Sequence, residues 1–396
     1  NVNNNKCGLI EAIINARTTN AGAMRPDCAA GNLNGPDTIS LPNNGTFVLT
    51  SAHNEQFGPT GLPVITSSMT IEGHGATISG DGSYPFFRIL AVDANGALTL
   101  SNTTIRDGVG QYYGGGILSH GALTLSGSAI IDNHAWYDYS QGGGVFSDGQ
   151  LTVASSVIAD NGAGTGGGLF IDGGTATITG SAVTGNVSGD QYWADGAGIN
   201  VHAGQVTIIN TVISGNISQG DEEGGGQGGG VNVNTNAQAT ISGSTLSGNT
   251  AEAYCEGFSG ETHPGLGGGL SNEGTTLIVN STISGNLGSY GGGLANLANG
   301  SLTVIQSTVT GNEAEYSEYE GGEYPCLATG GSGGGLFTGP SYWGSFNGTT
   351  TLRGVILSGN TADLSAPQAL FDGDDLATMT VNAFNVFGQN GNAGLV

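Results

Sequence analysis

The sequence predicts an all-β protein, a right-handed parallel β-helix that begins with a short capping helix. Two recurring features favour this fold. A glycine triplet followed by an apolar residue occurs eight times, once in a degenerate form, and an Asn recurs after the strands that follow. The closest triplets lie 24 residues apart, as between Gly143 and Gly167. A repeat of that length holds a few short strands and their turns, and such coils must stack to bury a common core.

The two repeated features can be followed along most of the chain. The triplets begin at Gly114, Gly142, Gly166, Gly196, Gly228, Gly267, Gly291 and Gly333. The recurring Asn residues are Asn133, Asn161, Asn186, Asn216, Asn249, Asn286, Asn312 and Asn360. Glycine permits a positive φ at a tight corner, and Asn both tolerates such a corner and can hydrogen-bond along a stack of strands. We therefore expect both residue types to be structural rather than catalytic.

The segments between these markers have the composition of short strands. Residues 122–125 and 277–279 are typical, because apolar and β-branched residues dominate them or alternate with Ser and Thr. Stacked coils would pair each strand in parallel with its equivalents about 4.8 Å above and below. A β-propeller is disfavoured, because its blades need about 40 residues or more.

The two ends differ from the repeat. Leu9, Ile10, Ile13 and Ile14 fall at helical spacing, so residues 1–37 are expected to form a cap with an amphipathic helix over the first coil. The β-helix is expected to occupy residues 38–396, with less regular first strands at 38–41, 47–49 and 69–71. The last candidate strands are 379–381 and 385–387, and the final residues up to Val396 carry no recognisable cap.

Charge excludes several kinds of partner. Against 31 acidic residues there are only six Lys and Arg, and the net charge is -25. Nucleic acids and anionic membranes are therefore disfavoured partners, because both require basic residues to neutralise phosphate. No apolar run is long enough to insert into a membrane. The excess of carboxylates is compatible with calcium as a cofactor, although a solvated acidic surface is the simpler interpretation.

The four cysteines indicate an exported protein. They contain no CxxC pair, which argues against zinc, and their even number suggests two disulfides formed in an oxidising compartment. Cys7 and Cys28 flank the predicted helix, whereas Cys255 and Cys326 lie in the two longest insertions between repeats. Of the three possible connectivities, Cys7–Cys28 with Cys255–Cys326 is the simplest.

The beginning of the chain resembles a known bacterial domain. Residues 7–16, which begin Cys7-Gly8-Leu9-Ile10-Glu11-Ala12-Ile13, resemble the N-terminal domain named for its CSLREAI motif, with Gly8 and Ile10 in place of its Ser and Arg. Bacterial exported proteins of that type often continue into GGG-I-x-N repeats similar to the present coils, and the repeats more loosely resemble chlamydial polymorphic outer-membrane proteins. The resemblance implies a secreted or surface-displayed β-helix, and it carries over no catalytic residue.

The candidate functional surface consists of the insertions between each recurring Asn and the next triplet. All of them follow the same corner, so we expect them to project from one edge, where aromatic rings could contact a glycan or a partner. The candidate contact residues are Trp136, Tyr137, Tyr139, Tyr192, Trp193, Tyr316, Tyr319 and Tyr324. The candidate calcium ligands are Asp221, Glu222 and Glu223. Packing of the insertions on one another is the alternative interpretation.

These observations favour an extracellular structural or adhesive β-solenoid over an enzyme. Exposed strand edges at the end of the stack suggest that the chain associates with itself, and non-closing contacts would build a filament. The alternative is a β-helix that binds or cleaves polysaccharide, as a lyase or a glycoside hydrolase. A lyase needs a base and groups that neutralise a uronate, yet Arg353 is the only Lys or Arg after Asp107. No spacing singles out a pair of hydrolytic carboxylates.

We accordingly predict that the purified protein does not cleave polysaccharides. Incubation with neutral and uronate polysaccharides, with and without calcium, should release neither reducing nor unsaturated ends, because the repeats contain almost no basic side chains. Turnover that survives repurification would contradict this prediction.

Overall fold

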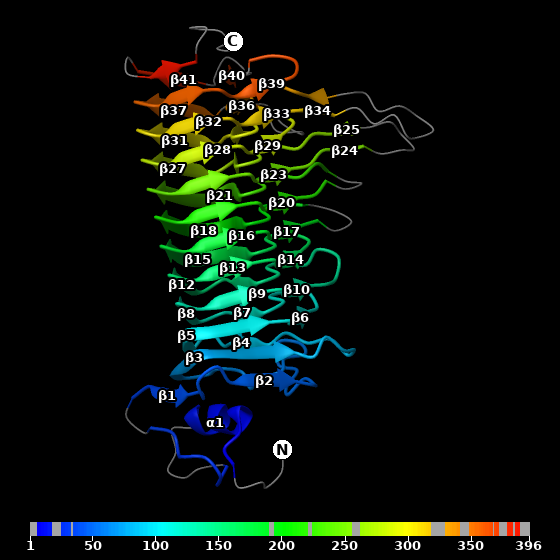
Figure 1. The fold of residues 1–396 in the computed structure, drawn as a ribbon, viewed down its shortest axis with the longest axis vertical. Coiled ribbons are helices and arrows are strands. Elements are labelled where there is room, and N and C mark those ends of the chain that lie inside the picture. The colour runs from blue at the N-terminus through cyan, green and yellow to red at the C-terminus, as the bar shows by residue number, and fades with distance from the viewer. Residues whose placement is uncertain are drawn as a thin grey trace.

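The chain folds into a parallel β-helix, a tall stack of coils that rises from the N-terminus to the C-terminus (Figure 1). The computed structural model describes residues 6–17, 25–32, 35–189, 194–220, 224–255, 262–317, 329–340, 348–366, 368–371, 378–382 and 385–388. Two sheets, of 29 and nine strands, contain only parallel pairs, and both run along the stack. The predicted parallel β-helix is therefore confirmed, together with its N-terminal helix.

Each regular coil has four sides, which we number in chain order from the glycine triplet. The first side consists of β4 (Leu90–Val92), β7 (Ile117–Ser119), β11 (Val145–Ser147), β26 (Leu270–Asn272), β30 (Leu294–Leu297), β36 (Leu336–Gly339) and β40 (Ala369–Phe371). The second side consists of β1 (Asp37–Ser40), β8 (Ala122–Ser126), β12 (Gln150–Ala154), β27 (Thr275–Val279), β31 (Ser301–Ile305), β37 (Thr349–Arg353) and β41 (Thr378–Val381).

Five longer strands continue around a corner and join these sides into one sheet. The first and second sides are joined by β15 (Leu169–Thr179), β18 (Ile199–Ile209) and β21 (Val231–Ser242). The second and third sides are joined by β3 (Ser68–Gly80) and β5 (Ala97–Arg106). The third side otherwise consists of β2 (Thr46–Leu49), β9 (Ala129–Ile131), β13 (Val157–Ala159), β16 (Ala182–Thr184), β19 (Val212–Ser214), β22 (Thr245–Ser247), β28 (Thr282–Ser284), β32 (Thr308–Thr310), β38 (Ile356–Ser358) and β42 (Val386–Phe387).

The fourth side forms the nine-stranded sheet and leads into the insertions. Its two-residue strands are β6 (Val109–Gly110), β10 (His134–Ala135), β14 (Gly162–Ala163), β17 (Val187–Ser188), β20 (Ile217–Ser218), β23 (Thr250–Ala251), β29 (Leu287–Gly288), β33 (Glu313–Ala314) and β39 (Thr361–Ala362). Two insertions contain antiparallel hairpins, formed by β24 (Tyr254–Cys255) with β25 (Thr262–His263) and by β34 (Tyr316–Ser317) with β35 (Thr329–Gly330). Figure 1 shows these insertions leaving the stack at one edge, as expected.

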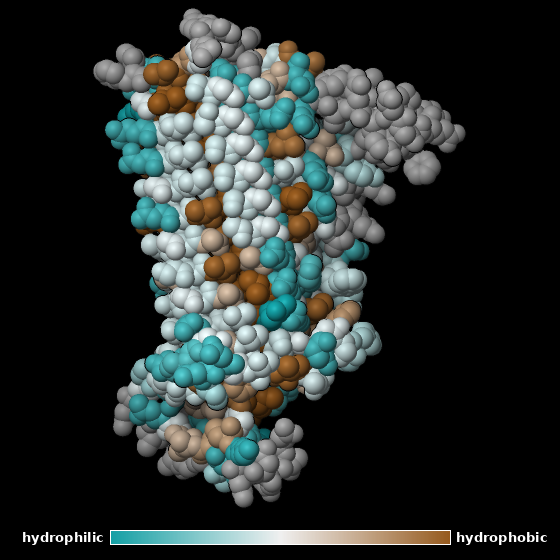
Figure 2. Space-filling view, viewed as in Figure 1, coloured by the Kyte–Doolittle hydropathy of each residue, from teal (hydrophilic) through white to brown (hydrophobic). Residues whose placement is uncertain are grey.

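The core is a continuous column of aliphatic side chains inside the coils. Alternate residues of each strand point inward, so Leu123 and Leu125 of β8 are buried whereas Thr124 between them faces outward. Ile130 of β9 and Ile117 of β7 complete the same layer. On the face shown in Figure 2, pale residues of intermediate hydropathy run along the stack, with scattered hydrophobic patches among them and hydrophilic residues at the left margin.

Left-handed residues turn the chain at three points of a regular coil, namely at the first glycine of the triplet, as at Gly142 with a φ of 70°, and at two further corners. Gly127, Ser155 and Gly180 have φ between 49° and 57° at the corner between the second and third sides. Asp132, Asp160 and Gly185 have φ between 54° and 65° at the corner before the fourth side. The recurring Asn itself follows this second corner and does not adopt a positive φ. The expectation that the recurring Asn occupies the left-handed corner is therefore wrong, because the preceding residue makes the turn and the Asn side chain points inward.

The recurring Asn residues form a buried ladder along the whole stack. The Nδ2 atom of each donates a hydrogen bond to the Oδ1 atom of the next, over 2.8–3.0 Å from Asn133 to Asn360. Each Oδ1 also accepts a hydrogen bond from a backbone N–H one coil earlier, as Asn216 does from Asn186 at 3.0 Å. All eight side chains are buried. The ladder satisfies backbone groups at a corner where the strand ladder is interrupted.

A second ladder of hydroxyl groups stabilises the corner between the second and third sides. The residues are Ser128, Ser156, Ser181, Thr211, Ser244, Ser281 and Ser307, and all are buried. Each hydroxyl oxygen accepts a hydrogen bond from the backbone N–H one coil earlier, as Ser156 does from Ser128 at 3.0 Å. Val355 occupies the equivalent position in the next coil, where its N–H donates instead to Asn385 at 2.7 Å.

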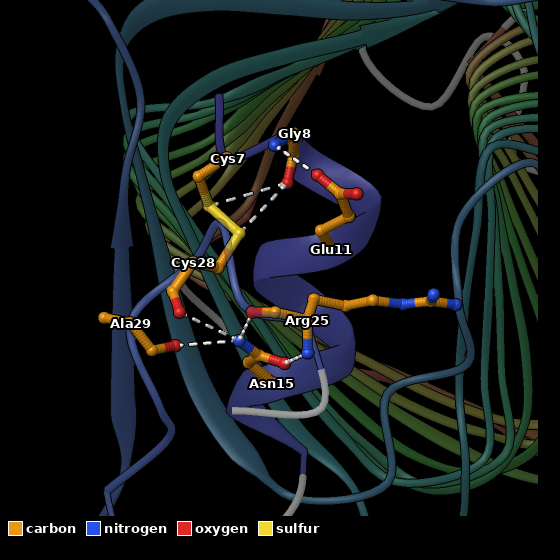
Figure 3. Close-up of a disulfide and its surroundings, with 7 residues drawn as sticks. All are labelled: Cys7, Gly8, Glu11, Asn15, Arg25, Cys28 and Ala29. Carbon is orange, nitrogen blue, oxygen red and sulfur yellow. Dashed lines mark hydrogen bonds between the residues drawn. A yellow bond between two sulfur atoms is a disulfide. The ribbon is translucent and has the colours of Figure 1, made fainter. Parts of the chain in front are cut away.

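The N-terminal helix closes the first coil. Helix α1 (Leu9–Ala16) places Leu9, Ile13 and Ala16 in the main core. Asn15 attaches the helix to the following segment by donating to the carbonyl oxygens of Arg25 and Ala29, both at 3.0 Å, and Cys7 forms a disulfide with Cys28 (Figure 3). The first predicted disulfide is thus confirmed. The second predicted partner, Cys326, lies outside the described residues.

Replacement of one ladder residue, Asn216→Ala, is expected to lower the free energy of unfolding by about 3 kcal/mol. The substitution removes the acceptor of two Asn186 donors and the donor to Val183, and unsatisfied buried groups cost about 1–3 kcal/mol each. Urea unfolding measures the change. The exposed strand residue Gln205, changed to Ala, is the control and should stay within about 0.5 kcal/mol of wild type. Equal stability of both variants would contradict a stabilising ladder.

Candidate functional site

Exposed aromatic side chains gather at the edge where the first insertions leave the stack. We call Tyr84, Phe86, Tyr112, Trp136 and Tyr137 the aromatic cluster. The ring centroids of Phe86 and Trp136 lie 5.9 Å apart, and those of Tyr112 and Tyr137 lie 5.1 Å apart. Tyr84 contacts Phe86 with centroids 5.8 Å apart. Trp136 is 64% exposed and Tyr84 is 84% exposed. Large apolar rings that remain this accessible are candidates for ligand contact.

The coil repeat itself brings the cluster together. The backbone N–H of Trp136 donates to Gly110 at 3.0 Å, and that of Tyr137 donates to Gln111 at 2.9 Å. Consecutive insertions therefore begin as parallel neighbours before they diverge. Ser140 closes the second insertion by donating its hydroxyl to the carbonyl of Ala135 at 2.8 Å. The aromatic rings are thus mounted on backbone that the stack holds in place.

The buried side chain of Arg88 holds the backbone next to the aromatic cluster in place. Arg88 is only 2% exposed, and its guanidinium donates to the carbonyl of Tyr113 at 3.1 Å and to the carbonyl of Phe57. Burial lowers the pKa of Arg88 to about 10, and Glu55 partly opposes this effect. The guanidinium still carries its charge at neutral pH. It therefore ties the turn next to Tyr112 to the loop around Phe57 through backbone carbonyls.

His134 lines a shallow hollow beside the cluster. The hollow is also bordered by Trp136, Gly162 and Gly189. Gly162 leaves room for the imidazole, because a Cβ atom there would come within 2.6 Å of Nδ1 of His134. Although the residue as a whole is exposed, desolvation of the imidazole lowers the pKa of His134, and Asp132 partly opposes this effect.

A second hollow lies higher on the same edge and is acidic. It is lined by Glu252 and Glu315, together with Thr250, Leu287 and Ser289. Burial raises the pKa of both glutamates, and the pKa of Glu315 is raised further by Glu313 and Asp363. Within the described residues, no group of three or more His, Cys, Asp or Glu side chains is arranged to hold a metal ion.

The structure brings together only part of the predicted contact set. Trp136, Tyr137 and Tyr139 lie in one insertion, and Tyr139, with a φ of 60°, is 59% exposed. Tyr316 lies in β34, and its side chain is not described. The remaining predicted contact residues and calcium ligands lie outside the described part of the chain, namely Tyr192, Trp193, Tyr319, Tyr324, Asp221, Glu222 and Glu223.

Sequence reasoning missed two features of the surface. Tyr84 and Phe86 precede the first triplet and so lie in none of the insertions between repeats, although the run Tyr84-Pro85-Phe86-Phe87 is itself a signal. Sequence reasoning also missed a row of polar residues after the first side. Nδ1 of His120 contacts Asp148 at 2.9 Å, and Nδ1 of His202 contacts Asp172 at 2.6 Å. Each of the four is the fourth residue after its triplet, so the repeat register could have identified them.

The aromatic cluster presents a surface that a ligand could contact. Its rings offer flat apolar faces and its tyrosines offer hydroxyl groups, which together fit a ligand that is apolar on one face and polar at its rim. The neighbouring Asp81 remains anionic, because hydrogen bonds from Ser83 lower its pKa.

In the described residues no helix is long and apolar enough to cross a bilayer.

Comparison with known proteins identifies no relative. No protein family, no curated protein and no solved structure matches the chain.

His134, which lines the hollow beside the cluster, should make the stability of the fold depend on pH. Because the folded state lowers the pKa of His134, it favours the neutral ring, and the resulting stability is present above about pH 6.5 and is lost as pH falls through the folded pKa. His134→Gln should therefore lose less stability than wild type between pH 7 and pH 5. Urea midpoints at both pH values measure the difference. Identical pH dependence of the two proteins would contradict the assignment.

Proposed function

We propose that the chain is an exported, adhesive β-solenoid that binds neutral extracellular polysaccharide through the aromatic cluster. The observation that carries this proposal is the gathering of accessible rings from three neighbouring coils, with Tyr84, Tyr112, Trp136 and Tyr137 each between 46% and 84% exposed. Isolated exposed rings are ordinary on protein surfaces, whereas rings that meet across coils, as Phe86 and Trp136 do, mark a candidate contact site.

The chemistry of the cluster favours a carbohydrate. Pyranose rings present axial C–H groups on one face and hydroxyl groups around the rim, so they stack on aromatic faces while their hydroxyls meet tyrosine hydroxyls and nearby carboxylates. Because Trp136 and Tyr137 are attached to stacked backbone, that backbone needs little further ordering on binding. A preformed platform of this kind loses less entropy than a flexible loop would.

The charge of the protein favours a neutral polysaccharide over a polyuronate. The net charge is -25, and Asp81, Asp107 and Asp132 each precede a cluster residue by no more than five positions in the sequence. Arg106 makes salt bridges to Asp107 and Asp132, each over 2.9 Å, so its charge is already compensated. A polymer of uronates would be repelled by the remaining carboxylates.

Two observations support an extracellular location for this binding. The Cys7–Cys28 disulfide is of a kind that persists in oxidising compartments. The opening residues resemble the cap of bacterial exported β-helix proteins. Self-association into a filament and binding of calcium by the acidic insertions remain further parts of the proposal, and light scattering with and without calcium tests both.

The test is co-sedimentation with insoluble cellulose, chitin, xylan and a cross-linked polygalacturonate. Wild type should bind at least one of the neutral polymers and not the polygalacturonate. Trp136→Ala and Tyr137→Ala should each weaken that binding by about threefold to tenfold, as expected for the loss of one ring contact.

The control is Leu364→Ala, which removes another exposed apolar side chain, 61% accessible, on a distant coil. Its binding should equal that of wild type, and circular dichroism should show that all three variants are folded. Unchanged binding by both cluster variants would assign the rings to packing. Absence of binding to every polymer would overturn the proposal.

A further inference from the structure

A column of threonines runs along the outer face of the second side. Successive residues of the column are paired across neighbouring strands, so they lie directly above one another. The column consists of Thr38, Thr70, Thr99, Thr124, Thr152, Thr177, Thr207, Thr240, Leu277, Thr303, Thr351 and Thr380. Eleven of its twelve positions are therefore Thr, and the first eight are uninterrupted. The eight span about 34 Å at the usual strand spacing.

Strand propensity alone does not account for this column. Threonine is a good strand former, but so are Val, Ile and Tyr, and those residues would be equally suitable at an exposed strand position. The outward positions of the adjoining third side show that freedom, because Ala129, Val157 and Ala182 follow one another in register there. Exposed strand positions thus recur in every coil, and the middle outward position of the second side is the one that is almost always Thr.

The surroundings of the column are uncharged. From β5 to β31, the outward positions on either side of the column carry Ala, Gln, Ser, Thr, Ile or Val and no ionisable group, although the protein carries a net charge of -25. In the described part of the chain, no hydrogen bond to another residue is found for the hydroxyl groups of the column.

The geometry resembles an ordered layer of water. Each Thr offers one hydroxyl that can donate and accept hydrogen bonds and one methyl group that orders the water around it. The hydroxyls repeat about every 4.8 Å along the stack, close to the repeat of oxygen atoms in ice. We propose that this threonine face binds ice, with the column holding a row of water molecules in positions that the crystal lattice continues.

Other occupants fit this face less well. A polysaccharide would be expected to stack on aromatic rings, and the described outward positions of the second side contain none. An anionic or cationic polymer would need charged partners, and the outward positions from β5 to β31 contain none. A regularly spaced, rigid and uncharged array instead matches a crystal surface, since rigidity preserves the match over many repeats.

The experiment measures ice growth in the presence of the full chain. Wild type should shape growing ice crystals, separate the freezing point from the melting point and slow recrystallisation. Thr152→Tyr and Thr207→Tyr should abolish ice shaping, because each puts a bulky ring in the middle of the face. The matched control, Thr245→Tyr, places the same ring on the third side and should retain the activity.

Circular dichroism and thermal melting verify that each variant is folded, so lost activity cannot be attributed to unfolding. Wild type that leaves ice growth unchanged at high concentration would overturn the proposal. Equal loss in all three variants would also overturn it, because the effect would not belong to the column. The aromatic variant Trp136→Ala should retain full ice activity, which separates this inference from the proposed polysaccharide site.

Discussion

The hydrogen bonds of the Asn ladder are the constraint on which the rest of the structure depends. A parallel β-helix must return its chain to the same place in every coil, and each return leaves backbone groups without strand partners. The ladder from Asn133 to Asn360 satisfies those groups and aligns each fourth-side corner with the next. Because that alignment is maintained, insertions of very different length can follow the same corner without disturbing the core.

Because of this constraint, the surface has two kinds of region, the stacked strand faces and the insertions. From β5 to β31, outward second-side residues such as Thr152 repeat at the strand spacing and are uncharged, because each packs beside its equivalents above and below. Like charges stacked at that distance would repel one another. The insertions are free of this restriction, so acidic and aromatic residues such as Glu315 and Trp136 accumulate there. The partition of charge follows from the architecture before any ligand is considered.

The same architecture explains what could be predicted from the sequence. The triplets, the strands, the recurring Asn and the helix with Leu9 and Ile13 are local patterns, and the structure confirms them. The contacts between coils were harder to predict, because neighbours in space are separated by spacings that vary with each insertion. Asn161 and Asn186 are 25 residues apart, whereas Asn312 and Asn360 are 48 apart. The hydroxyl ladder and the His120–Asp148 pair required that register to be known.

The rigid stack also determines how its surfaces can bind. A single ring or hydroxyl contributes little free energy, and a flexible chain would lose most of it in ordering several such groups at once. Here the ladder orders the backbone during folding, so rings as far apart in sequence as Phe86 and Trp136 meet without a further loss of backbone entropy. Weak contacts that repeat along a fixed axis then add together. A β-helix is therefore better suited to extended, periodic partners than to a small ligand, since small ligands need an enclosing cavity rather than a long face.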